Sequence, residues 1–326
     1  MALLVFVWLG NRLPTWGRTA LNLSTASSGA KTILITNRSV GLITEATEQY
    51  FVEDFYTAPT AWKRATQTLN QNFRDGFWLK TTERFFVLEQ FMATYNVESL
   101  FHAELDNWIF NITGLDARLD NVGRGLFCPR DSLDRGIASL IYINRSDSLA
   151  QLNRLALDNT LIEKNDMTLL GHLLATSDLF FSLCTENAFQ DLDSIAWKRV
   201  SAEVSHGIFD AAAIGQFLFG IDPRNGSILL TNGYENENKG CDLWRLQYSL
   251  KDKSNAFELT NPETGQSINL FNIHVHSKLF KQLTNENRLS QILDRVNQGK
   301  KTLMNIDLMQ NRIVRGIRSR LIAGQK

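Results

Sequence analysis

Short apolar runs alternate with helix-like patterns over the first third of the chain. Val5 to Leu9 and Thr32 to Thr36 are apolar runs of strand length. Between them, apolar residues recur at helical spacing from Trp16 to Ser27, and a small polar cluster follows. This alternation is typical of βαβ units that build a mostly parallel sheet with flanking helices, so we expect an α/β fold.

The later elements follow from the same periodicities. Apolar spacing predicts a helix over 81–92, strands over 100–103 and 137–143, and a chiefly helical stretch over 146–200. Gly, Asn and Asp are dense between Gly220 and Gly240, which indicates loops rather than a linker between domains. Residues 268–276 alternate like a strand, and the segment after them is predicted to be helical to the C-terminus.

Composition limits the classes of partner. The chain has 326 residues, 44% of them hydrophobic, so it is long enough to bury a full core. Its 34 basic residues balance its 34 acidic residues, so no overall field attracts nucleic acid, and we expect no nucleic-acid partner. The cysteines Cys128, Cys184 and Cys241 are widely spaced, which disfavours a disulfide framework and a zinc ribbon and favours a reducing, cytoplasmic location.

The N-terminal run from Ala2 to Leu9 is apolar but much shorter than the roughly 20 residues that span a bilayer. It also lacks a basic region before it, so we predict a buried strand. A cleaved signal peptide is the alternative, and the small residues from Ala26 to Ala30 favour it.

Acidic side chains interrupt an apolar segment at Glu104-Leu105-Asp106. Carboxylates at i and i+2 point to the same side of an extended chain, where their mutual repulsion is costly without a cation. Oxygen ligands favour Mg²⁺ or Mn²⁺, and no cysteine lies near the triplet. The alternative is that Glu104 and Asp106 are solvated turn residues.

Two histidines follow a later apolar strand and offer a further ligand. Alternation places His274 and His276 on the same face, and either one could complete a divalent site with Asp106 and Glu104. Lys278 comes two residues later and brings a positive charge to the same segment. Ordinary sheet histidines with hydrogen bonds to their neighbours are the alternative.

Asp210 is a second acidic candidate. Aspartate is a good helix N-cap, and the small residues after Asp210 suit a closely packed helix start. A carboxylate could instead take a proton from a reacting hydroxyl, as a general base does. Glu235 and Glu237 are alternatives for that role, and Gln216 and Asp222 are lower-ranked contacts to an acceptor.

Four motifs in order resemble bacterial glycosyltransferases of the GT-A fold. They are Thr82 to Phe86, His102 to Asn107, Phe209 to Gln216 and Asn272 to Lys278. The resemblance implies a Rossmann-like catalytic domain over residues 1–285, with a nucleotide-sugar half at about 1–145 and an acceptor half at about 146–285. Residues 286–326 would form a helical C-terminal extension.

The resemblance also implies roles for individual residues. Asp106 would bind the metal directly, and Glu104 would contact the metal through water or contact the sugar nucleotide. Arg84 would face the donor, although an ion pair with Glu83 or Glu89 is the structural alternative. Position alone, not the resemblance, makes Trp8 and Asn37 candidates to hold the nucleotide base and ribose, because they lie at the ends of the first two strands. From their chemistry, Lys278 could stabilise the leaving diphosphate, and Asp210 ranks first as the base.

The implied function is transfer of a sugar from a nucleotide-diphosphate donor to a glycan or lipid-linked acceptor, with Mn²⁺ or Mg²⁺, in cell-surface polysaccharide synthesis. A nucleotidyltransferase is one alternative, but no Gly-rich basic loop follows the first strand. A non-catalytic glycan- or partner-binding module is the other, with Trp8, Trp62, Trp78, Trp108 and Trp244 as stacking surfaces.

The last segment, 300–326, is basic and has apolar residues at helical spacing. Such a helix can lie on an anionic membrane, which would place the protein at the inner face of the membrane and suit a glycolipid acceptor. A helix docked on the catalytic domain with solvated arginines is the alternative.

Overall fold

The computed structural model describes residues 2–68, 76–158, 165–185, 200, 203–204, 207–222, 243, 246–251, 256–265 and 267–298. Within these residues the main sheet has eight strands, in the order β3-β2-β1-β4-β8-β6-β7 with β9 paired to β6. These strands are β1 (Leu3–Trp8), β2 (Lys31–Thr36), β3 (Glu48–Phe51), β4 (Leu100–Ala103), β6 (Leu126–Ser132), β7 (Arg135–Gly136), β8 (Leu140–Ile143) and β9 (Phe180–Leu183).

The main sheet is mostly parallel, as the alternation of elements predicts. Strands β3, β2, β1 and β4 all run in one direction, and β9 is parallel to β6. Strand β8 is antiparallel to both of its neighbours, β4 and β6. Since β1, β2 and β4 are parallel neighbours, their carboxyl ends lie at one edge of the sheet, where ligands bind in open α/β folds.

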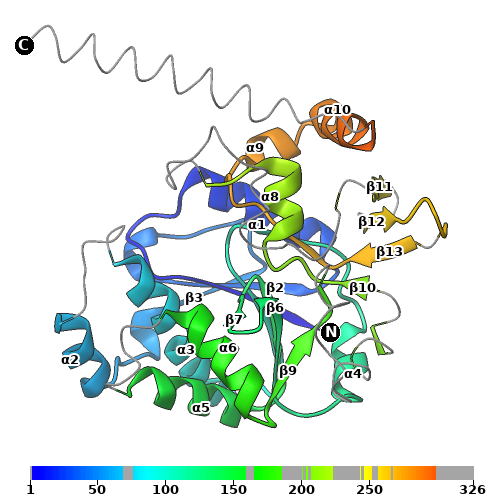
Figure 1. The fold of residues 1–326 in the computed structure, drawn as a ribbon. Helices are drawn as coiled ribbons and strands as arrows, with labels where there is room; N and C mark the ends of the chain where they lie inside the picture. Colours follow the sequence, from blue (N-terminus) through cyan, green and yellow to red (C-terminus); the bar gives the residue numbers. More distant parts are fainter. Residues whose placement is uncertain are drawn as a thin grey trace, which may run out of the picture.

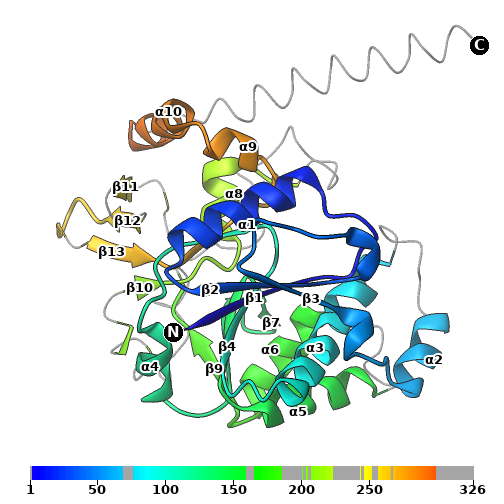
Figure 2. The same cartoon turned by 180° about the vertical axis from the view of Figure 1, so that it is seen from behind.

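Helices cover both faces of the main sheet (Figures 1 and 2). Helix α1 lies on one face, and α3, α5 and α6 lie on the other. The described helices are α1 (Thr15–Ser27), α2 (Thr60–Thr68), α3 (Phe77–Thr94), α4 (Leu115–Asp120), α5 (Ser146–Ala156), α6 (Asp166–Thr176), α8 (Ala213–Phe219), α9 (Phe280–Leu283) and α10 (Glu286–Asn297).

Alternation along β1 explains the two layers of core. Leu4 and Phe6 point to the α1 side and pack with Leu21, whereas Val5 packs on the α3 side with Phe85. Because successive side chains of a strand point to opposite faces, a nearly continuous apolar run is what a strand covered on both faces requires.

The second half of the chain adds two smaller sheets. One has the order β10-β13-β12-β11, and the other pairs β14 with β5. Their strands are β5 (Asn107–Ile109), β10 (Gly207–Ile208), β11 (Gln247–Lys251), β12 (Ala256–Thr260), β13 (Ser267–Leu270) and β14 (Asn272–His274). The antiparallel β5–β14 pair sets His274 opposite Asn107, directly after the acidic turn.

Two sequence predictions about elements are wrong in part. The stretch 146–200 is not helical throughout, because Phe180–Leu183 forms β9 inside the main sheet. Its short apolar run cannot be told from a helix segment by periodicity alone. The strand predicted over 268–276 is divided at Phe271 into β13 and β14, which belong to different sheets.

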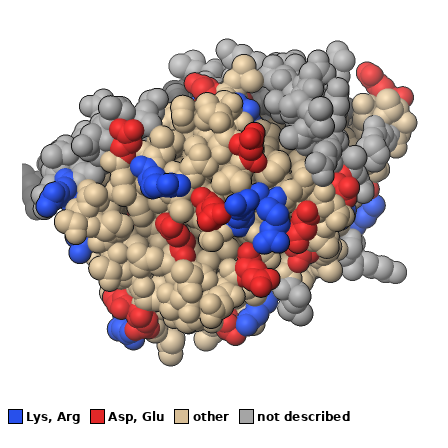
Figure 3. All heavy atoms as spheres, turned by 90° about the horizontal axis from the view of Figure 1, so that it is seen from below, with Lys and Arg blue, Asp and Glu red and all other residues tan. Residues whose placement is uncertain are grey.

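Charges of both signs alternate over the described face shown in Figure 3. This mixture agrees with the balanced composition and forms no single basic field on that face. Among the described residues, no helix is both long and apolar enough to cross a membrane. The basic segment 300–326 lies outside the described residues.

Candidate metal centre

The acidic residues lie in a tight turn between β4 and β5. The Asn107 amide donates to the Glu104 carbonyl oxygen (3.1 Å), which closes the turn. Leu105 is buried beneath α1, where a Cβ added at Gly17 would lie 2.7 Å from the Leu105 Cδ2 atom. Since Leu105 is directed into the core, the two flanking carboxylates are left on the other side of the turn, as the i, i+2 spacing predicts.

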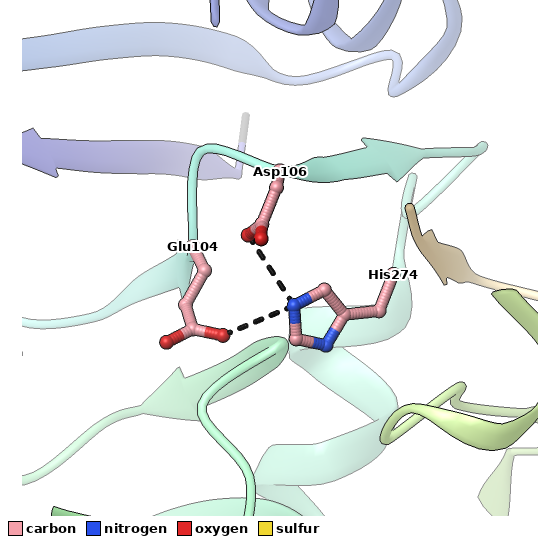
Figure 4. Close-up of side chains that lie close together, drawn as sticks. All are labelled: Glu104, Asp106 and His274. Atoms are coloured by element: carbon pink, nitrogen blue, oxygen red, sulfur yellow. Dashed lines mark ion pairs between the residues drawn. The ribbon is translucent and has the colours of Figure 1, made fainter. Parts of the chain in front are cut away.

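His274 meets both carboxylates (Figure 4). Its Nε2 atom lies 3.3 Å from Glu104 Oε2 and 3.3 Å from Asp106 Oδ1. One ligand atom from each of the three residues lies within 4.8 Å of the other two. Two carboxylates and one imidazole make a donor set that suits Mn²⁺ or Mg²⁺, and three protein ligands leave coordination positions for water or substrate oxygens.

The tautomer of His274 is fixed by the protein. Its Nδ1 atom lies 2.8 Å from the Ala211 carbonyl oxygen, which can only accept, so Nδ1 carries a proton and Nε2 faces the carboxylates. Burial lowers the pKa of His274, but Asp106 and Glu104 outweigh it and raise the pKa to about 9. Without a metal, His274 is therefore protonated at neutral pH and neutralises part of the acidic charge.

Lys278 also contacts the acidic turn. Its Nζ atom forms an ion pair with Asp106 Oδ2 and lies 5.6 Å from the centre of the Trp16 ring. Burial raises the pKa of Asp106, but Lys278 and His274 overcome this and hold the pKa well below its usual range. Lys278 and His274 thus supply positive charge where a divalent cation would act.

Arg84 holds the first acid of the turn. Its guanidinium donates to Glu104 Oε1 (2.8 Å) and to Asp166 Oδ2 (2.6 Å), and Arg84 is buried. Arg84 therefore forms ion pairs in the core, as the structural alternative predicts, but its partners are Glu104 and Asp166. The predicted partners were Glu83 and Glu89. Glu83 instead accepts from the Tyr56 hydroxyl, and Glu89 accepts from Asn153. The structure does not bring Arg84 to an open surface.

Asp166 is a site residue that the sequence analysis missed. It lies in the first turn of α6, is buried, and also accepts a hydrogen bond from the Thr81 hydroxyl (3.3 Å). An Asn165-Asp166 pair at a helix start looks like an ordinary cap, and Asn165 does cap α6 by accepting from the Thr168 amide. Nothing in the local pattern indicates that Arg84 lies opposite.

His276 is not one of the three grouped ligands. Its ring lies against that of His274, with centroids 4.0 Å apart and the ring planes tilted by 39°, and burial together with His274 and Lys278 holds the pKa of His276 well below the usual value. Among the described residues its Nε2 atom has no hydrogen-bond partner. Of the two histidines that the alternation leaves open, the geometry favours His274 as the ligand.

Trp8 lies near this centre, whereas Asn37 is linked to it by no described contact. The Trp8 ring meets Trp16 edge-on at 6.0 Å, and Trp16 in turn lies under Lys278. Trp8 Nε1 donates to the Arg12 carbonyl oxygen (3.0 Å). Asn37 follows β2, and its Oδ1 atom is buried without a described partner, so it can accept a hydrogen bond.

The Asp210 side chain caps the start of α8 and is not accessible to solvent. Its carboxylate is fully buried and accepts from the amides of Ile214 and Gly215 at the start of α8. Burial raises the pKa of Asp210 to about 6. An acceptor hydroxyl would have to reach this carboxylate through the core. Gln216 and Asp222 are also buried, and Glu235 and Glu237 lie outside the described residues.

No family model matches the chain, and no curated protein matches it in sequence. Solved structures similar to part of the chain include mouse xyloside xylosyltransferase 1 in its apo form, at a TM-score of 0.35 and 10% identity over 57% of this chain and 86% of that one. The galactosyltransferase LgtC in complex with donor and acceptor sugar analogs is similar at a TM-score of 0.40 and 12% identity, over 56% of this chain and 74% of that one. The glycosyltransferase GlyE of Streptococcus pneumoniae TIGR4 is similar at a TM-score of 0.36 and 16% identity, over 58% of this chain and 46% of that one.

All three of these structures are glycosyltransferases. With TM-scores of 0.40 and below, the likeness concerns part of the fold only.

Proposed function

We propose that the chain is a metal-dependent glycosyltransferase that uses a nucleotide-diphosphate sugar. One observation carries the proposal: Glu104, Asp106 and His274 converge within 4.8 Å in the turn that follows a parallel strand. A divalent cation held there would lie at the carboxyl end of the sheet, where nucleotides bind in open α/β folds. Mn²⁺ and Mg²⁺ are the cations that this oxygen-rich set favours.

The metal would supply Lewis-acid stabilisation of the diphosphate that leaves the sugar. Asp106 and His274 would be its direct ligands, and Glu104 would offer the oxygen that Arg84 does not occupy. Arg84 orients Glu104 and itself stays in the core, so its contribution to the donor site passes through that carboxylate.

Lys278 would bind the diphosphate when the cation takes Asp106. The ammonium group already lies beside that carboxylate and rests over the Trp16 ring, so a short movement of the side chain would bring it to the leaving group. A positive charge placed there favours the transition state, in which negative charge develops on the diphosphate.

Trp8 and Asn37 would hold the nucleoside part of the donor. Trp8 is the last residue of β1 and lies beside the Trp16 ring. Asn37 follows the neighbouring parallel strand β2, and its side-chain oxygen has no hydrogen-bond partner among the described residues. An aromatic face suits a base, and the buried Asn37 oxygen would have to become accessible before it could accept from the ribose or from an imino group.

A glycan or lipid-linked acceptor, a role in polysaccharide synthesis and a cytoplasmic location belong to the same proposal. They rest on the sequence resemblance and on the basic segment 300–326. A non-catalytic binding module fits less well, because Trp62 and Trp108 are core residues with only 4% and 5% of their surface exposed and offer no stacking platform.

The substitution Asp106→Asn tests the metal centre directly. Calorimetry of wild type with nucleoside diphosphates should show binding in Mn²⁺ that EDTA removes. D106N should lose this metal-linked affinity by about 100-fold, because a charged ligand is replaced by a neutral one. Asp147→Asn, a surface change on α5, is the matched control and should bind like wild type. Equal metal-linked binding by D106N and wild type would sink the proposal.

A further inference from the structure

A chain of buried polar side chains lies behind the metal centre. Asp210, Asn272 and Asn107 are each 0% exposed, and they come from the segment between β10 and α8, from β14 and from β5. Each has its hydrogen-bonding groups engaged with the others or with backbone. Buried polar groups with complete partners fix one arrangement of the surrounding chain.

The Asp210 carboxylate joins three backbone amides. Its Oδ1 atom accepts from Ile214 (3.0 Å), and its Oδ2 atom accepts from Gly215 (2.8 Å) and from His274 (2.9 Å). One carboxylate therefore ties the start of α8 to the backbone of the metal-ligand candidate. Hydrogen bonds to an ionised acceptor are among the stronger ones in proteins.

Asn272 and Asn107 extend this connection to the acidic turn. The Asn272 Nδ2 atom donates to the Asp210 carbonyl oxygen (2.9 Å) and to Asn107 Oδ1 (2.9 Å), and Asn272 Oδ1 accepts from the Asp210 amide (3.1 Å). Asn107 Nδ2 then donates to the Glu104 carbonyl oxygen (3.2 Å). The network thus contacts the backbone of both walls of the metal centre.

The backbone of His274 packs directly against α8. A Cβ added at Gly215 would lie 2.0 Å from the His274 carbonyl oxygen, so the helix and the strand are in direct backbone contact. The ring is held as well, because Nδ1 donates to the carbonyl oxygen of Ala211, the residue after Asp210. Backbone and ring of His274 are thus both anchored to the Asp210–Ala211 segment.

We propose that Asp210 is a positioning residue of the metal centre, which acts through His274 and, by way of Asn272 and Asn107, through the Glu104 turn. This inference rests on the proposed function, since it concerns how that same site binds its cation. A ligand held in place before the cation arrives loses little conformational freedom on binding, so the protein binds the metal more tightly. The carboxylate itself transfers no proton in this role.

Asp210→Asn tests the proposal because an amide keeps the size of the side chain but cannot accept from three amides at once. We expect D210N to bind Mn²⁺ about 10- to 100-fold more weakly than wild type, the range for partners that orient metal ligands. Electron paramagnetic resonance of free Mn²⁺ gives the affinity. The visible absorption of the Co²⁺-loaded protein reports the geometry of the ligands and should change in D210N.

Asn153→Ala is the matched control for general destabilisation. Asn153 is also a buried polar residue, but it bonds to α3 through the Phe85 carbonyl oxygen and Glu89, on the other side of the main sheet. N153A should lower the melting temperature and leave the Mn²⁺ affinity and the Co²⁺ spectrum as in wild type. A loss of Mn²⁺ affinity in N153A equal to that in D210N would overturn the proposal.

The outcomes separate this inference from the proposed function. If wild type itself binds no Mn²⁺, the proposed function fails. If wild type binds Mn²⁺ and folded D210N binds it equally well, only the positioning role fails. Should D210N not fold, Asn272→Ala and Asn107→Ala are measured in the same way, with an expected loss of about tenfold. Unchanged affinity in either, or failure of all three to fold, overturns the positioning role.

Discussion

Glu104 is one methylene longer than the aspartate that opens the usual acidic triplet of the resembled family, and the structure shows what the extra length spans. Its Oε1 atom receives the Arg84 guanidinium at 2.8 Å, while its Oε2 atom lies 3.3 Å from His274 Nε2. The two oxygens thus face two different partners. Glu104 can therefore be anchored in the core and still offer one oxygen to a cation.

Protonation of His274 makes metal binding depend on pH. Its pKa of about 9 in the metal-free protein means that a proton occupies Nε2 at neutral pH and must leave when a cation binds. Apparent Mn²⁺ affinity should therefore rise with pH by up to tenfold per unit below pH 9. Titrations between pH 6 and 8.5 measure this, and His172→Gln, an exposed change, should leave the slope unaltered. A Mn²⁺ affinity of the wild type that does not change between pH 6 and 8.5 would contradict this prediction.

The raised pKa of His274 also determines how the free energy of unfolding changes with pH. The folded pKa of about 9 exceeds the usual value of 6.5, so the stabilising contribution of protonated His274 is complete below pH 6.5. It is lost as the pH rises through 9. Denaturant unfolding of the metal-free protein should thus show a falling free energy of unfolding across that range.

Lys278 and the metal compete for one carboxylate. Since the ammonium contacts Asp106, Lys278→Met should free that ligand and raise Mn²⁺ affinity without nucleotide by about tenfold, the worth of one charged hydrogen bond. The same variant should bind nucleoside diphosphate with Mn²⁺ about tenfold more weakly, because a phosphate partner is lost. Calorimetry measures both constants.

Lys281→Met is the matched control, because Lys281 is exposed on α9 and carries the same charge three residues later. K281M should match wild type in both titrations. Weaker Mn²⁺ binding by K278M in the absence of nucleotide would exclude competition between the ammonium and the cation.

At the scale of elements, the pairing of β5 with β14 builds the site. Helix α1 supports this pair, since the Ser24 hydroxyl accepts from the Ile109 amide (3.1 Å) and the Ser27 hydroxyl donates to the Ile109 carbonyl oxygen (2.5 Å). These two serines thus form hydrogen bonds with the backbone groups of β5 that point away from β14. The acidic turn is therefore held by a helix on one side and a distant strand on the other.

Hydrophobic periodicity was sufficient for most of the elements near this site. Strand β1, helix α1, strand β2 and helix α3 each lie within a few residues of their predicted bounds, because each buries a regular apolar face. Strand β9 was missed because an apolar run of four residues cannot be told from a helix segment by periodicity alone. The division at Phe271 was missed because one apolar run serves two different sheets.

At the scale of the whole molecule, two cores and the added sheets bring distant segments to one edge of the main sheet. Nucleotide-sugar binding there should stabilise the whole fold by mass action, by about 2.7 kcal/mol at a ligand concentration 100 times its dissociation constant. A rise of several degrees in melting temperature is expected for a chain of this size. Thermal-shift measurements with a panel of nucleotide sugars should show it with Mn²⁺ and lose it in EDTA. The absence of a shift with every donor would contradict the proposed substrate class.

The sequence by itself determined the mixed α/β architecture, the acidic turn after an apolar strand, and the presence of His274, His276 and Lys278 in one later segment. These follow from local periodicity and residue chemistry, which need no knowledge of distant contacts. Only the tertiary structure decided that His274 faces the carboxylates, that Arg84 pairs with Glu104 and Asp166, and that Asp210 lies in the core behind the site. The physical reason is sequence distance: the ion pair between Lys278 and Asp106 joins residues 172 positions apart, and only chain folding brings such groups together.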